Sequence, residues 1–312
     1  MNDFPKIPWY HIGKLIAEGG TAKVYWGIDL RSGFPVAIKE LKIRHFKNPT
    51  IRQKFKDVEA QMYLYMQHPN IPKLVDFIDM KDKELMYIVM EFIEGKSLED
   101  YIYKEIGLIP EQRALPLFLD ILDTVAYLHN HNVLHLDIKS NNIMLQPNGK
   151  IKIIDLGIAS RMTEASSGST GFGTPAYMPP EQSEMGKCGK YTDIFALGVM
   201  LFEMLTGHLP FTSMNPNTRQ MIEEIKYKIK YEPTPQMSMF YPPIKPKLQS
   251  IVDCALAKKP GDRYQSCEEF AAAIKDYMNM NKPKTNNSSG NKNSNVGKSS
   301  TGSSIRKKLF GI

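Results

Sequence analysis

The chain has 312 residues, of which 42% are hydrophobic and 23% charged, so it is long and apolar enough to bury a core. That balance is typical of a globular protein and excludes a chain that is disordered throughout. No stretch approaches the ~18 uninterrupted apolar residues of a membrane-spanning helix, and no apolar run follows the first residues, so neither a span nor a secretory signal is expected.

The net charge of +7 is concentrated at one end. Residues 281–312 hold seven basic and no acidic residues, which leaves 33 basic and 33 acidic residues before them. The first 280 residues are therefore neutral, and a basic surface for nucleic acid is not expected there. The last stretch is rich in Asn, Ser, Gly and Lys, which predicts a disordered tail.

Short strands are predicted over most of the first ninety residues. Residues 24–29 and 35–41 are rich in β-branched side chains and are separated by the turn Arg31-Ser32-Gly33. A further strand is predicted over 86–90. Between the predicted strands 35–41 and 86–90 lies a helix whose apolar residues recur at spacings of three and four: Phe55, Val58, Met62 and Tyr65.

Helices are predicted to dominate after Gly95. Residues 191–206 are apolar almost all round, which suits a helix buried inside a lobe. We expect an α+β fold with a small antiparallel β lobe over about 1–90, a connector at 91–95, a larger helical lobe over 96–280, and the tail 281–312. A second helical stripe consists of Leu115, Phe118, Leu119, Leu122, Val125 and Ala126.

Two features of the first lobe suit phosphate binding. Between two predicted strands, residues 17–24 form a small-residue turn around Gly19 and Gly20, and such a turn lets backbone N–H groups approach a phosphate. A plain hairpin would also explain this turn. Lys39 lies on a strand, and Glu59 shares the apolar face of the helix, where a carboxylate is costly unless it is paired. We therefore expect a Lys39–Glu59 pair.

The predicted second lobe carries a set of polar residues that follow one another along the chain as Asp137, Lys139, Asn142 and Asp155. Asp137 can accept a hydrogen bond from a hydroxyl, Lys139 can reach a phosphate, and Asn142 can ligate Mg²⁺. After the strand-like residues 143–145 and the predicted strand 151–154 comes Asp155, a second candidate metal ligand. A solvated loop would explain any one of these residues but not the set.

In this order the motifs resemble those of the eukaryotic-type protein kinase family, over about 12–277. The patterns GGTAKVY and GTPAYMPPEQ are most similar to the bacterial Ser/Thr branch of that family. The resemblance implies that Lys39 holds the α- and β-phosphates of ATP and that Glu59 anchors Lys39. It implies that Asp137 orients or deprotonates the substrate hydroxyl. The implied metal is Mg²⁺, with Mn²⁺ as an alternative ion, bound by Asn142 and Asp155.

The same resemblance implies a nucleotide pocket. Backbone groups of Glu91 and Ile93 would meet the adenine edge, Ser97 the ribose, and the turn at Gly19 the phosphates. The apolar walls would be Ile16, Val24, Ala37, Met90, Met144 and Ile154.

The residue choice also implies a substrate class. Lys139, two residues after Asp137, together with Thr174 in the substrate-facing segment, is the form of the family that phosphorylates Ser and Thr. The expected function is ATP-dependent phosphorylation of protein Ser/Thr hydroxyls, including autophosphorylation. The structural landmarks of the family would be Glu181 paired with Arg263, and Asp193 and Gly198 on the helix that supports the catalytic loop.

The chain departs from the family pattern at several positions. Ala17 and Ala22 stand where the family has glycines, at a cost of about 1 kcal/mol each if the backbone there needs a positive φ. Leu136 stands where most members have an Arg that binds a phosphate on the activation segment, and Ser160 stands at a second basic position. We therefore expect that phosphorylation of this segment is not required for activity. The packing changes are Leu156 for Phe, Phe195 for Trp and Pro179 for Ala.

Two other functions stay open. A pseudokinase, which binds ATP as a scaffold without catalysis, is disfavoured because the five residues of the reaction are all present. A small-molecule phosphotransferase of related fold is disfavoured by the GTPAYMPPEQ segment, which suits the docking of a peptide. The five residues are Lys39, Glu59, Asp137, Asn142 and Asp155.

Location and partners are less constrained. Cys188, Cys254 and Cys267 are odd in number and lack metal-ligand spacing, which predicts reduced thiols in the cytoplasm. The basic residues 306–308 precede an apolar end at 309–312, similar to the cytoplasmic margin of a membrane span. A solvated linker is the preferred interpretation of the tail, and attachment to an anionic membrane surface is the second. Nucleic acid is disfavoured, because no aromatic residues are interleaved to stack on bases. The oligomeric state is not predicted.

Overall fold

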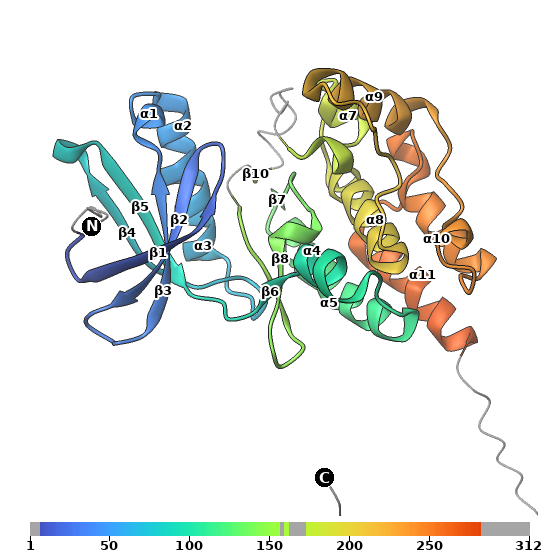
Figure 1. The fold of residues 1–312 in the computed structure, drawn as a ribbon, viewed down its shortest axis with the longest axis horizontal. Coiled ribbons are helices and arrows are strands. Elements are labelled where there is room, and N and C mark those ends of the chain that lie inside the picture. The colour runs from blue at the N-terminus through green and yellow to red at the C-terminus, as the bar shows by residue number, and fades with distance from the viewer. Residues whose placement is uncertain (1–6, 157–158, 162–172, 282–312) are drawn as a thin grey trace, which may run out of the picture. The chain divides into compact units, whose positions relative to one another are not determined.

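The computed structural model describes residues 7–156, 159–161 and 173–281, apart from the side chains of residues 57, 58, 160 and 161. One compact unit ends at Met280, and in it a sheet-rich part precedes a helical part (Figure 1). This is the two-lobed α+β architecture that the sequence predicts. The predicted tail falls outside the described residues, apart from Asn281.

Five antiparallel strands form the sheet of the first lobe in the order β1-β2-β3-β5-β4. The predicted strand 35–41 is confirmed, and the predicted strands 24–29 and 86–90 lie inside slightly longer ones. Lys39 sits on the middle strand, where it pairs with Val24 on one side and Ile88 on the other. The strands are β1 (Tyr10–Glu18), β2 (Ala22–Asp29), β3 (Pro35–Leu41), β4 (Leu74–Met80) and β5 (Leu85–Glu91).

The helical stretch between β3 and β4 differs from the predicted one at its C-terminal end. It consists of α1 (Ile43–Phe46), α2 (Pro49–Gln53), the π-helical η1 (Lys54–Ala60) and α3 (Gln61–Tyr65). Phe55 and Met62 are buried as predicted, but the prediction for Tyr65 was wrong, because Tyr65 is 63% exposed and Tyr63 is buried instead. A π-helical turn holds more residues than an α-helical turn, so it rotates the following residues about the helix axis. The side chain of Val58 lies outside the described residues.

The second lobe is built around the buried helix α8 (Lys190–Thr206), which α5 (Glu111–Asn130), α10 (Pro246–Ala255) and α11 (Cys267–Met280) surround (Figure 1). The predicted helices 115–126 and 191–206 lie within α5 and α8. Gly198 permits close packing, because a Cβ there would lie 2.8 Å from the Cβ of Ala255 on α10. The remaining helices are α4 (Leu98–Asp100), α7 (Pro180–Ser183) and α9 (Thr218–Tyr231), with short 3₁₀ or π-helical turns at Lys81–Lys83, Tyr101–Ile106, Ser140–Asn142, Pro175–Tyr177, Met237–Met239 and Pro260–Asp262.

Short strands carry the polar loops of the second lobe. β8 (Ile143–Leu145) lies between β6 (Lys96–Ser97) and β9 (Ile151–Ile153), and β7 (Val133–Leu134) pairs with β10 (Ser160–Arg161). Because β8 and β9 are antiparallel, with Ile143 opposite Ile153, the residue before β8 and the residues after β9 lie at the same end. This register brings Asn142 towards Asp155.

Cys188, Cys254 and Cys267 are free thiols, of which Cys188 and Cys267 are buried. Among the helices that the structure describes, none is both long and apolar enough to cross a membrane.

Candidate active site

Lys39 lies at the centre of a charged cluster. Its ammonium donates to the carboxylate of Glu59 and, at 2.7 Å, to Oδ1 of Asp155. Lys39 is on β3, Glu59 is on η1 and Asp155 follows β9, so three elements converge here. Lys39 and Glu59 are only 8% and 2% exposed. The predicted Lys39–Glu59 pair is present, and Asp155 joins it.

The two carboxylates keep the buried ammonium charged. Burial disfavours the charged form of Lys39, but Coulomb attraction to Asp155 and Glu59 outweighs burial and raises the pKa of Lys39 above its ordinary value. A buried charge without such partners would be strongly destabilising. The Lys39 ammonium therefore stays charged in the interior of the site, held between two carboxylates.

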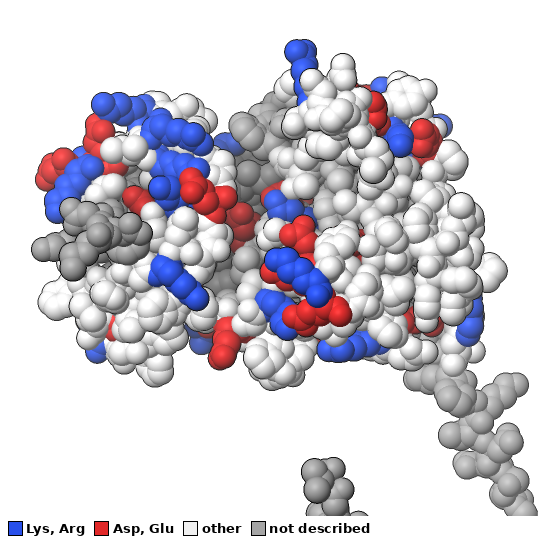
Figure 2. Space-filling model, in the orientation of Figure 1, with Lys and Arg blue, Asp and Glu red and all other residues white. Residues whose placement is uncertain are grey.

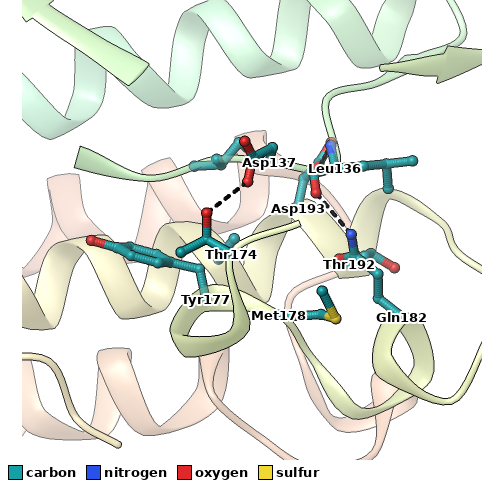
Figure 3. A pocket seen from close by; sticks show the side chains of 10 residues that line it. Leu136, Asp137, Thr174, Tyr177, Met178, Gln182, Thr192 and Asp193 are labelled. Carbon is teal, nitrogen blue, oxygen red and sulfur yellow. Dashed lines mark hydrogen bonds between the residues drawn. The ribbon is translucent and has the colours of Figure 1, made fainter. Parts of the chain in front are cut away.

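Asp137 forms a second cluster with Lys139 and Thr174, and Figure 3 shows the contact of Asp137 with Thr174. Its Oδ2 accepts a hydrogen bond from Lys139 Nζ at 2.8 Å, and its Oδ1 accepts one from the Thr174 hydroxyl at 3.1 Å. Lys139 Nζ also donates to the Thr174 hydroxyl at 2.9 Å. The two residues on which the predicted substrate class depends, Lys139 and Thr174, thus contact each other and Asp137.

Asp193, at the start of α8, holds the backbone before Asp137. Its carboxylate accepts the N–H of His135 at 2.9 Å and the N–H of Leu136 at 2.8 Å, and it pairs with His129 Nε2 at 2.8 Å. Burial of Asp193 would raise its pKa, but these donors outweigh burial and lower it. The support that the sequence predicts for Asp193 is therefore present.

Asn142 and Asp155 have the donor chemistry of a hard cation site. The Nδ2 of Asn142 donates to the carbonyl of Asp137 at 2.9 Å, so Oδ1 is the end of the amide that a cation would use. The N–H of Ile154 donates to the carbonyl of Asn142 at 2.8 Å and ties the two segments together. A carboxylate and an amide oxygen at one end of a strand pair fit Mg²⁺, which takes few protein ligands beside phosphate and water.

The candidate nucleotide residues surround the junction of the lobes. Register places Ala37 beside Met90 and Ser97 beside Met144. Figure 2 shows the surface hollowed between the lobes, with acidic side chains at the edge of the hollow. Of the predicted wall, Ala37, Met90 and the neighbouring Ile93 are buried, Val24, Met144 and Ile154 are half-buried, and Ile16 is 41% exposed at the end of β1.

Two of these candidates have local structural contacts. The Ser97 hydroxyl accepts the N–H of Asp100 at 3.0 Å and caps α4. The side chain of Glu91 pairs with Lys152 on β9 and accepts the N–H of Lys73 at 3.1 Å. These contacts hold the connector between the lobes, while the predicted adenine contacts concern the backbone of Glu91.

A backbone hydrogen bond closes the small-residue turn, and the two alanines of the turn have an unstrained backbone. The N–H of Gly19 donates to the carbonyl of Ala22 at 2.9 Å, and Arg44 Nη2 donates to the carbonyl of Gly20 at 2.7 Å. Neither Ala17 nor Ala22 has a positive φ, so the two alanines carry no backbone cost.

Leu136 lies in an apolar environment instead of facing a phosphate. It is 4% exposed and packs with Leu134 and Cys188. Its φ of 63° is in the left-handed region, and its carbonyl accepts Gln182 Nε2 at 2.8 Å (Figure 3). Gly173, with φ 140°, permits this contact, because a Cβ there would lie 3.1 Å from Gln182 Nε2. The side chain of Ser160 and residues 162–172 lie outside the described residues.

Glu181 and Arg263 form the predicted pair. Arg263 Nη1 and Nη2 donate to the two carboxylate oxygens of Glu181 at 2.7 and 3.0 Å, and the guanidinium lies over the Phe195 ring. The Arg263 side chain is fully buried. This pair joins the end of the substrate-facing segment to the helical core.

Three contributors were missed from the sequence. The buried Glu203 of α8 accepts hydrogen bonds from Tyr177 and, at 3.0 Å, from Ser140, and so joins the substrate-facing segment to the catalytic loop. Gln182 binds the Leu136 carbonyl, and the Tyr63 hydroxyl contacts the backbone at Asp155. A carboxylate inside the apolar stretch 191–206 was a visible signal for Glu203. The other two contacts had no signal.

Comparison with known proteins gives the family of the chain. The model of the protein kinase domain matches residues 10–275, and the chain belongs to that family. The family uses ATP and a divalent metal ion, typically Mg²⁺. The chain is similar to bacterial proteins named as serine/threonine-protein kinases, which confirms the predicted resemblance.

Three of these relatives show how far the similarity extends. The chain is 34% identical to PrkC of Bacillus subtilis, 33% identical to a probable serine/threonine-protein kinase of Streptomyces coelicolor and 31% identical to PknB of Mycolicibacterium smegmatis. Each match covers 85% of this chain but only 40%, 39% and 42% of the respective relative. The chain thus spans about two fifths of the length of these relatives.

Proposed function

We propose that this protein is an active kinase that transfers the γ-phosphate of ATP to Ser and Thr hydroxyls of proteins, itself included. The observation that carries the proposal is the position of the Lys39 ammonium between Glu59 and Asp155, at hydrogen-bond distance from both. The fold thus brings a charged Lys and a candidate metal ligand together from positions 116 residues apart, and phosphoryl transfer needs both groups beside the phosphates.

On the phosphate side, Lys39 contacts the α- and β-phosphates while Glu59 fixes its ammonium. Asn142 and Asp155 would hold the metal, for which we propose Mg²⁺ with Mn²⁺ as a substitute. When bound, the metal neutralises charge on the β- and γ-phosphates. The backbone N–H groups of the turn at Gly19 cover the phosphates.

On the hydroxyl side, Asp137 accepts the hydrogen bond of the incoming Ser or Thr. The hydroxyl oxygen bonds to the γ-phosphorus, the bond from that phosphorus to the β–γ bridging oxygen breaks, and ADP leaves with that oxygen. The hydroxyl proton passes to the Asp137 carboxylate. Lys139, held by Asp137 and Thr174, offsets charge on the transferring phosphoryl group.

The nucleotide base occupies the junction of the lobes. The backbone of Glu91 and Ile93 contacts the adenine edge, and Ser97 lies by the ribose. We retain the division into a catalytic domain over 1–280, with lobes meeting at 91–95, and a separate tail. The apolar walls are Ile16, Val24, Ala37, Met90, Met144 and Ile154.

The test is incubation with ATP and Mg²⁺ followed by mass spectrometry of the protein and of a generic Ser/Thr substrate. We expect phosphorylation that is lost on chelation of the metal and in Asp137→Asn. A protein that binds ATP but produces no phosphorylated residue under any metal would instead be a pseudokinase. Incorporation that survives Asp137→Asn unchanged would refute the assignment of that residue.

The tail and the location of the protein belong to the same proposal. We propose a cytoplasmic kinase whose tail acts as a solvated linker, with contact to an anionic membrane surface as the second interpretation. The support is compositional: basic residues without interleaved aromatics, next to a neutral catalytic domain.

A further inference from the structure

Tyr63 connects the helical stretch of the first lobe to the candidate metal ligand. Its hydroxyl oxygen accepts the backbone N–H of Asp155 at 3.0 Å and the N–H of Leu156 at 3.4 Å. The Tyr63 side chain is 3% exposed, and its ring packs in the same apolar cluster as the fully buried Leu156. The contact joins residues 92 positions apart in the chain.

The backbone at Asp155 needs such support. Its φ is 66°, a left-handed conformation that non-glycine residues adopt at a cost unless the surroundings hold it. The two neighbouring N–H groups also need an acceptor in this buried place. One hydroxyl oxygen with two lone pairs accepts both.

Glu59 and Tyr63 act on Asp155 from the same helical stretch. They are four residues apart, about one turn, so both face the interior. Glu59 contacts Lys39, and Lys39 contacts the Asp155 carboxylate, while Tyr63 binds the Asp155 backbone. The side chain and the main chain of one residue are thus both tied to the same stretch.

We propose that Tyr63 is a positioning residue for the metal-binding carboxylate, and that its hydroxyl fixes the Asp155 backbone so that the carboxylate faces the metal. This inference rests on the proposed function for the identity of the metal site.

The test is Tyr63→Phe, which removes the hydroxyl oxygen and keeps the ring. The matched control is Tyr65→Phe, the same change two residues along on a side chain that is 63% exposed. We expect the Asp155 and Leu156 amides to exchange hydrogen about twofold to tenfold faster in Tyr63→Phe, as NMR would measure, because they lose their acceptor. In calorimetric titrations of ADP, the Mg²⁺ concentration for half-maximal enhancement of binding should rise by a similar factor. Both quantities should stay unchanged in Tyr65→Phe.

The kinetic pattern separates positioning from folding. In Tyr63→Phe the kcat should fall and the Mg²⁺ requirement should rise, while the KM for a peptide substrate stays near that of the parent and the unfolding temperature falls by only a few degrees. Tyr63→Met, which also removes the ring, should lower the unfolding temperature without a further rise in the Mg²⁺ midpoint. If amide exchange and the Mg²⁺ midpoint in Tyr63→Phe match the parent, the inference is wrong. If both change but the parent protein phosphorylates nothing, the positioning role stands and the proposed function fails.

Discussion

Replacement of Glu181 by Gln would test the buried pair beneath the substrate-facing segment. Both Glu181 oxygens accept from Arg263, whose guanidinium is fully buried and also donates to the carbonyls of Ala257, Tyr191 and Lys258. Glutamine keeps the shape and one acceptor oxygen. It removes the charge and turns an NH₂ group towards a guanidinium that has only donors.

The expected loss follows from that geometry. Removal of one partner from a buried ion pair leaves an uncompensated charge and costs about 3–5 kcal/mol. For a domain of this size, each kcal/mol lowers the unfolding temperature by about 2–4 °C, so Glu181→Gln should unfold roughly 6–20 °C below the parent.

The control is Glu184→Gln, three residues further on. Glu184 pairs with Lys230, but their side chains are 52% and 42% exposed, and an exposed pair contributes little because water screens it. Differential scanning calorimetry of the parent and both variants measures the effect. A drop of less than 2 °C for Glu181→Gln, or equal drops for the two variants, would refute the reasoning.

Three further predictions concern catalysis, the tail and the activation segment. Asp137→Asn should keep its nucleotide affinity, measured by calorimetry, but its kcat should fall by roughly 10²–10⁴, the range for a positioned acid–base group. If the variant kept more than a tenth of the parental activity, that would contradict the role of Asp137. Deletion of 281–312 should leave peptide phosphorylation unchanged, and a truncated protein that is unfolded or inactive would show that the tail belongs to the catalytic domain. Because Leu136 cannot bind a phosphate, the combined activation-segment variant should have a kcat within a few-fold of that of the parent. A hundredfold loss of kcat would show that a phosphate on this segment binds another cation. That variant replaces Thr163, Ser166, Ser167, Ser169 and Thr170 with Ala and keeps Thr174.

The fold was predictable where local pattern and tertiary packing agree. Residues 35–41 are a short apolar run bounded by a turn, and they form β3 over the same span. Residues 191–206 are apolar on every side because α8 is covered all round. The phase of the helix before β4 was not predictable, because periodicity assumes 3.6 residues per turn. The stretch contains a π-helical turn at Lys54–Ala60, and after it Met62 is buried as predicted, whereas Tyr63 is buried and Tyr65 is exposed.

The site was predictable where residue type and order carry the chemistry. Lys39 with Glu59 could be inferred because a carboxylate on an apolar face needs a cation. Asn142 and Asp155 could be chosen as candidate metal ligands from their residue types and from the position of Asp155 at the end of a predicted strand, whereas the antiparallel register that brings them to one end came from the structure. The contact of Tyr63 with the Asp155 backbone could not be inferred. It depends on the distance between two elements far apart in the chain, and the acceptor of a backbone N–H leaves no trace in the sequence.

The supports of the site explain why loop phosphorylation should matter little. The catalytic loop is held through its backbone by Asp193 and Gln182, which bind the N–H and the carbonyl of Leu136. The segment with the candidate metal ligand Asp155 is held through its backbone by Tyr63. All of these partners lie outside residues 162–172, and Leu136 itself is buried among apolar side chains. Leu136 would not stabilise a phosphate in that stretch, because a leucine side chain neither donates a hydrogen bond nor offsets charge.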